Sequence, residues 1–70
     1  MNETFAVRLR KLRERHRVSR RTLADLCGIS KSAMARYERG EREPSAALVC
    51  QLADYFGVSA DYMLGRTENF

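Results

Sequence analysis

The sequence of 70 residues contains no tryptophan and has a single proline and a single histidine. Its two cysteines, Cys27 and Cys50, lack the spacing of a metal site and have no histidine paired with them. The sequence also lacks a Ser/His/Asp set, a paired-carboxylate pattern and a Gly-rich phosphate loop. These absences argue against an enzyme. They predict a protein that uses neither a metal nor a cofactor.

Long apolar runs are missing as well. No stretch approaches the roughly 20 residues of a membrane span, and no charged-then-apolar leader is present. We therefore expect a cytoplasmic protein without a membrane segment. With 44% hydrophobic and 31% charged residues, the composition is typical of one globular domain with a small core. Cys27 and Cys50 each fall on an apolar stripe and are interpreted as small buried hydrophobes, with a redox switch left open.

Charge is distributed unevenly along the chain. Residues 1–42 contain 12 Lys/Arg against 5 Asp/Glu, a balance of +7, whereas residues 43–70 contain 1 against 4, a balance of −3. A basic half of this kind is typical of a nucleic-acid binder, although a solvated basic face would produce the same count.

Residues 20–40 carry the clearest pattern, which is two short helices joined by a tight turn. Ser19 precedes the helix expected over 20–27, and Ser30 precedes the helix expected over 31–39. Each hydroxyl can accept an otherwise unpaired backbone N–H. Gly28 suits the turn because glycine adopts a left-handed backbone at little cost.

Three more helices are expected, the first from residue 3 or 4 to residue 16 and the others over 46–56 and 60–64. Spacing of i, i+4 and i+7 predicts the core side of the first, and Ser45 and Ser59 are predicted N-caps of the others. We predict an all-α, five-helix domain over residues 1–66 and a short tail over 67–70, with fraying from residue 66 unless Phe70 docks on a partner. The predicted core residues of the first helix are Phe5, Leu9 and Leu12, and those of the 46–56 helix are Val49, Cys50, Leu52, Ala53 and Phe56.

The side of the 31–39 helix that faces away from its apolar residues contains cations, a hydroxyl and a methyl group, and no acid. These residues are Lys31, Ser32, Ala35, Arg36 and Arg39. Such a surface suits an anionic partner that offers hydrogen-bonding edges. Plain solvated surface remains the alternative for each of them.

The order of short motifs closely resembles the Cro/C1-type helix-turn-helix domain, also called the lambda-repressor-like or xenobiotic-response-element type. The matching motifs, between Phe5 and Arg66, are Leu23-Ala24, Gly28-Ile29-Ser30, Tyr37-Glu38-Arg39-Gly40, Pro44-Ser45, LADYFGVS at 52–59 and DYMLGR at 61–66. The resemblance implies five helices, with 20–27 and 31–39 as the helix-turn-helix, and binding to operator DNA, commonly as a dimer.

The resemblance also implies roles for single residues. The 31–39 helix would enter the major groove, with base contacts from Lys31, Ser32 and Arg36. Phosphate contacts would come from residues at the edges of the groove, and two further residues complete the predicted DNA-binding set. The phosphate contacts are Ser19, Arg20, Arg39 and Arg42, and the two further residues are Ser30 and Ala35.

Two positions need separate treatment. Many relatives have Gln where this chain has Arg20; the arginine is expected to hold phosphate but to support Lys31 poorly, because like charges repel. Arg13 lies next to Leu12, near the buried edge, where a lone cation would be costly. The resemblance suggests Glu38 as its partner, in a structural pair that ties the first helix to the third.

The expected function is therefore a sequence-specific DNA-binding transcriptional regulator, more specifically a repressor. It would bind a pseudo-palindromic operator in double-stranded DNA as a homodimer, with half-sites about 34 Å apart. The alternative is an antitoxin-like or other protein-interaction module of the same fold, with a toxin or an antirepressor as its partner. The acid-free stripe discriminates between them, since a pure interaction module has no need of it.

Overall fold

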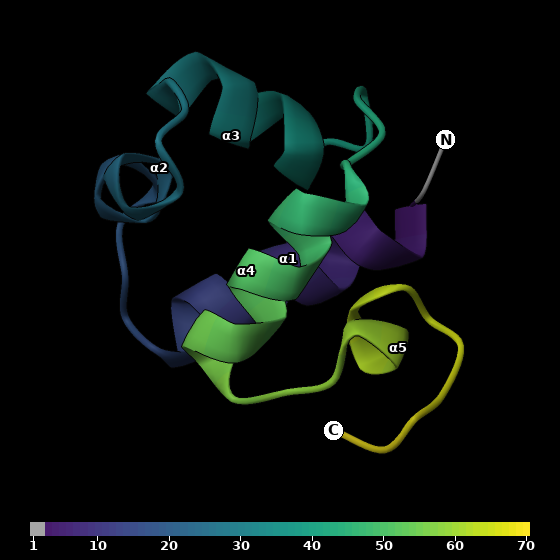
Figure 1. The fold of residues 1–70 in the computed structure, drawn as a ribbon. Helices are drawn as coiled ribbons and strands as arrows, with labels where there is room; N and C mark the ends of the chain where they lie inside the picture. The colour runs from purple at the N-terminus through teal and green to yellow at the C-terminus, as the bar shows by residue number, and fades with distance from the viewer. Residues whose placement is uncertain (1–2) are drawn as a thin grey trace.

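Residues 3–70, the part of the chain that the computed structural model describes, form five α-helices and no strand (Figure 1). Met1 and Asn2, with which the predicted domain begins, lie outside the described residues. None of these helices is long and apolar enough to span a bilayer. The helices are α1 (Glu3–Arg15), α2 (Arg20–Cys27), α3 (Lys31–Glu38), α4 (Ala46–Phe56) and α5 (Ala60–Met63).

The predicted all-α, five-helix fold is confirmed, with small differences at the helix ends. The first, third and fifth helices each end one residue earlier than expected. Arg39 and Leu64 act as C-caps of α3 and α5, so their own backbone N–H groups still bond to carbonyls one turn back. Serine N-caps begin α2, α3, α4 and α5 as predicted, each accepting a backbone N–H three residues on.

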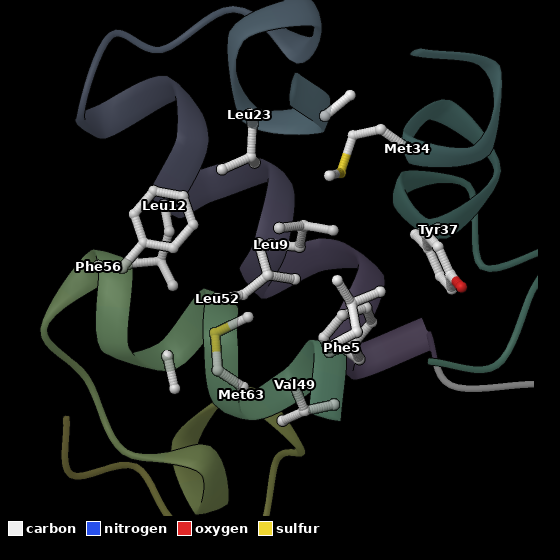
Figure 2. Close-up of a cluster of buried hydrophobic side chains, with 13 residues drawn as sticks. Phe5, Leu9, Leu12, Leu23, Met34, Tyr37, Val49, Leu52, Phe56 and Met63 are labelled. Carbon is white, nitrogen blue, oxygen red and sulfur yellow. The ribbon is translucent and has the colours of Figure 1, made fainter. Parts of the chain in front are cut away.

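All five helices contribute to one hydrophobic core (Figure 2). Helices of four to eight residues are unstable alone in water, so their stability comes from this shared packing. Burying one large apolar side chain contributes about 1.5–3 kcal/mol. The ten labelled core residues are Phe5, Leu9, Leu12, Leu23, Met34, Tyr37, Val49, Leu52, Phe56 and Met63.

The prediction of a buried Cys50 is wrong, because this residue is exposed. Successive helical residues are rotated by about 100°, so Leu48 and Cys50 flank Val49 on opposite sides. The core stripe of α4 leans toward Leu48, which is buried. Cys27 is half-buried against the core, and burial raises the pKa of its thiol, which disfavours the reactive thiolate.

The tail that was expected to fray makes contacts with Arg8 of α1 and with Tyr62. The Arg8 guanidinium donates from Nη1 to the Thr67 carbonyl at 2.7 Å and from Nη2 to Glu68 at 2.8 Å. It also lies 4.2 Å from the centroid of the Tyr62 ring, and the centroid of the Phe70 ring lies 4.8 Å from that of Tyr62. The tail therefore folds back beside α1 and α5, at the end of the molecule opposite α2 and α3 (Figure 1).

Candidate nucleic-acid interface

The turn between α2 and α3 fixes how the second helix is presented. Gly28 has φ +69°, and the N–H of Ile29 bonds to the Ala24 carbonyl at 3.0 Å. Ser30 then caps α3, accepting the N–H of Ala33 at 3.0 Å. A left-handed residue two positions before an N-cap allows α3 to leave α2 after a very short turn.

The outward side of α3 and the ends of its neighbours expose most of the residues expected to bind DNA. Lys31 and Arg36 form no ion pair with any residue of 3–70, so their charges are available to a ligand. Ala35 is half-buried and contributes only part of its methyl surface. The exposed members of the set are Ser19, Arg20, Ser30, Lys31, Ser32, Arg36, Arg39 and Arg42.

Arg39 already has an acidic partner on this surface. Its Nε donates to Glu41 Oε2 at 2.7 Å, and its Nη2 donates to Oε1 at 3.2 Å. These hydrogen bonds lower the pKa of Glu41, helped by the charges of Arg39 and Arg36, and they raise the pKa of Arg39. Glu41 therefore stays ionised and offsets one positive charge at the end of α3.

Arg42 lies with its guanidinium carbon 5.4 Å from the centroid of the Tyr37 ring. A cation over an aromatic ring is weakly held, because the interaction contributes only about 0.5–1 kcal/mol at an exposed site. Arg42 is therefore kept close to the C-terminal end of α3 while its N–H groups stay accessible.

The last residue of α3, Glu38, faces inward and joins three helices. Arg13 of α1 donates from Nε to Glu38 Oε2 at 2.5 Å and from Nη2 to Oε1 at 3.3 Å, so the suggested Arg13–Glu38 pair is present. Arg20 of α2 also donates from Nε to Glu38 Oε1, at 2.9 Å. Arg20 therefore shares the carboxylate with Arg13, a contact that the sequence alone did not suggest.

Two features of this surface were not predicted from the sequence. They are the pairing of Glu41 with Arg39 and the contact between Arg20 and Glu38. The charge sequence Arg39-Gly40-Glu41 was the available signal for the first, since a glycine lets the chain turn and bring opposite charges together. No comparable local signal exists for the second, because it depends on where three helices meet.

The comparisons with known proteins agree with this geometry. Residues 4–63 match the family described as a helix-turn-helix domain. The HTH-type transcriptional regulator AnsR of Bacillus subtilis is 46% identical over 61 residues, covering 87% of this chain and 53% of that protein. The uncharacterized HTH-type transcriptional regulator YobD of the same species is 37% identical over 65 residues, covering 93% and 58%. The chain thus spans little more than half the length of these relatives.

Solved structures share the arrangement of the helices. The restriction-modification controller protein C.AhdI from Aeromonas hydrophila superposes with a TM-score of 0.78 at 33% identity, covering 87% of this chain and 92% of that one. The P22 c2 repressor, solved in complex with a synthetic operator, has a TM-score of 0.80 at 28% identity, covering 86% and 91%.

Proposed function

This chain belongs to the helix-turn-helix domain family of the Cro/C1 type, and from that membership we propose that it is a sequence-specific DNA-binding transcriptional regulator, acting as a repressor in the cytoplasm. The observation that supports this most directly is the surface of α3. Lys31, Ser32 and Arg36 are exposed there, while the one acid of the helix, Glu38, is buried. Such a helix can approach a polyanion without repulsion.

In this proposal, α3 enters the major groove and its exposed side reads base edges. Lys31 and Ser32 contact bases or the adjoining phosphates, and Arg36 forms a bidentate contact with guanine. Phosphates on either side fix the register. The phosphate contacts are Ser19, Arg20, Arg39 and Arg42, and the residues that complete the interface are Ser30 and Ala35.

We further propose that the regulator binds a pseudo-palindromic operator as a homodimer. An apolar groove between α4 and α5 supports this, because none of the residues that line it belongs to α2 or α3. Half-sites would then lie about 34 Å apart. The groove is lined by Pro44, Ala46, Val49, Cys50, Ala60 and Leu64.

Selection from a pool of random-sequence duplex DNA, at roughly physiological salt, tests the DNA-binding proposal. We expect a two-fold symmetric consensus to be enriched. Arg36→Glu should abolish enrichment, whereas Arg66→Glu, which changes an exposed arginine far from α3, should not. Binding without enrichment would mean that the surface contacts the backbone alone, and no binding would favour the protein-interaction alternative.

Sedimentation tests the dimer separately. Ala46 and Ala47 both lie exposed in the first turn of α4, but only Ala46 lines the groove. Ala46→Glu is therefore expected to shift the protein toward monomer, and Ala47→Glu is its matched control. If neither variant changes sedimentation, the groove is not the contact between copies, and a toxin or antirepressor becomes the candidate partner to search for.

A further inference from the structure

Two arginines from different helices converge on the buried carboxylate of Glu38. The side chain of Glu38 is 1% exposed, that of Arg13 is 13% exposed and that of Arg20 is 43% exposed. The cluster therefore reaches from the core, at Arg13, to the protein surface, at Arg20.

Arg13 alone is enough to neutralise Glu38. It donates to both carboxylate oxygens, and its remaining Nη1 donates to the Val18 carbonyl at 3.1 Å. Every nitrogen of Arg13 is thus used inside the protein. Arg20 adds a second cation to a carboxylate that is already paired, so the cluster carries a net charge of +1. This surplus charge is located on the arginine that reaches solvent.

The contact with Glu38 uses one edge of Arg20 and leaves the other edge open. Arg20 donates from Nε, at 2.9 Å, and within residues 3–70 no hydrogen bond occupies either of its Nη groups. A guanidinium is planar and rigid, so fixing Nε also fixes the direction of both Nη groups. Arg20 lies in the first turn of α2 and is exposed, as are Lys31 and Arg36 of α3.

We propose that Glu38 is a positioning residue for DNA binding, which holds Arg20 by Nε so that its two Nη groups are pre-oriented for one DNA phosphate. The inference rests on the proposed DNA-binding function and adds to it. Holding the side chain in advance removes the entropy that a free arginine loses on binding. One buried acid thereby couples the packing of α1 against α3 to the affinity for DNA.

The experiment compares two conservative variants that keep the charge. Arg20→Lys retains the positive charge but has one nitrogen, which cannot bond Glu38 and present a two-donor edge to phosphate at once. Arg21→Lys makes the same change at the next residue, which is exposed. Both are titrated with the duplex enriched by the wild-type protein, over a range of salt concentrations. We expect Arg20→Lys to weaken binding about tenfold and Arg21→Lys to weaken it less than about twofold.

Glu38→Gln shows whether Glu38 acts through Arg20. Arg20→Lys is combined with it, and each protein is first checked by circular dichroism to be folded at the assay temperature. We expect the Arg20→Lys effect to fall from about tenfold to less than about threefold when Glu38→Gln is already present, because the amide is uncharged and leaves one acceptor oxygen, for which Arg13 and Arg20 compete. If the two effects multiply instead, Glu38 does not position Arg20.

An NMR measurement on the wild-type protein keeps the inference testable if Glu38→Gln does not fold. The Nε–H of Arg20 is expected to exchange with water more slowly than that of Arg21, both before and after DNA is added. Equal exchange rates, loss of the slow signal on DNA binding, or full affinity of Arg20→Lys would each overturn the positioning role. A wild-type protein that binds no duplex would instead overturn the proposed function on which the role rests.

Discussion

Two arginine–glutamate pairs lie at the C-terminal end of α3, a buried one on its inner side and an exposed one on its outer side. On the inner side, Arg13 and Glu38 are 13% and 1% exposed, with 2.5 Å between Nε and Oε2. On the outer side, Arg39 and Glu41 are 56% and 50% exposed, with 2.7 Å between the same atoms. Contact length hardly distinguishes the pairs, whereas burial does.

Burial decides what each pair can do. Water cannot solvate a buried carboxylate that has lost its partner, and the free energy of such a charge is high. The inner pair therefore fixes the relative placement of α1 and α3. An exposed pair is screened by salt and solvated when broken, so the outer pair contributes little to stability. It controls instead how much positive charge the end of α3 presents. The inner pair is therefore structural and the outer pair adjustable.

The largest expected effect comes from breaking the inner pair. Glu38→Ala leaves Arg13 without its carboxylate partner in a mostly buried position, which should cost about 3–5 kcal/mol in the free energy of unfolding. Urea unfolding followed by circular dichroism measures this, with Glu41→Ala as the matched control on the outer side. A midpoint that hardly moves in Glu38→Ala would mean that water reaches the inner pair in solution.

The next effect concerns the outer side of α3. Arg36→Ala should weaken operator binding by about 1–3 kcal/mol and relax the preference at one base pair. Arg39→Ala should weaken binding to all sequences alike and lower the salt slope by about one. Affinities measured on the operator and on single-base variants distinguish the two. Interchanged results would mean that α3 is rotated about its axis relative to the proposed orientation.

Local patterns predicted much of this structure. Each serine cap, the turn at Gly28 and most of the core follow from rules that involve residues within one or two helical turns. The Arg13–Glu38 pair was suggested by the resemblance. These features are local, or they depend on a motif that covers nearly the whole chain.

The errors arise where several elements meet. Cys50 lies about 100° from Val49 on α4, and only the packing of neighbouring helices decides whether that edge is covered. The tail at 67–70 accepts hydrogen bonds from Arg8, a residue of the first helix that is distant in the sequence. Arg20 was expected to contact a DNA phosphate, but it also donates a hydrogen bond to Glu38 on another helix. None of these contacts has a local signature.

A smaller effect is expected from removing the outer acid. Glu41→Gln frees Arg39 from its carboxylate partner and deletes one negative charge beside α3. We expect about two- to fivefold tighter DNA binding, because an acid that repels phosphate is removed and Arg39 no longer divides its hydrogen bonds between Glu41 and phosphate. The melting temperature should hardly change. Fluorescence anisotropy at several salt concentrations measures this, and Glu43→Gln, which alters an exposed acid two residues later, tests whether net charge alone explains it.

The smallest effect is the pH dependence of the outer pair. Hydrogen bonds from Arg39 lower the pKa of Glu41 in the folded protein, so the pair stabilises the fold at pH values above the ordinary glutamate pKa. That contribution is lost as the pH falls through the lowered pKa, because the protonated carboxyl no longer attracts Arg39. Side-chain carboxyl shifts in an NMR titration measure the pKa directly. In Arg39→Ala the pKa of Glu41 should return toward its ordinary value, and the same lowered value in both proteins would assign the shift to another cation, with Arg36 the nearest candidate.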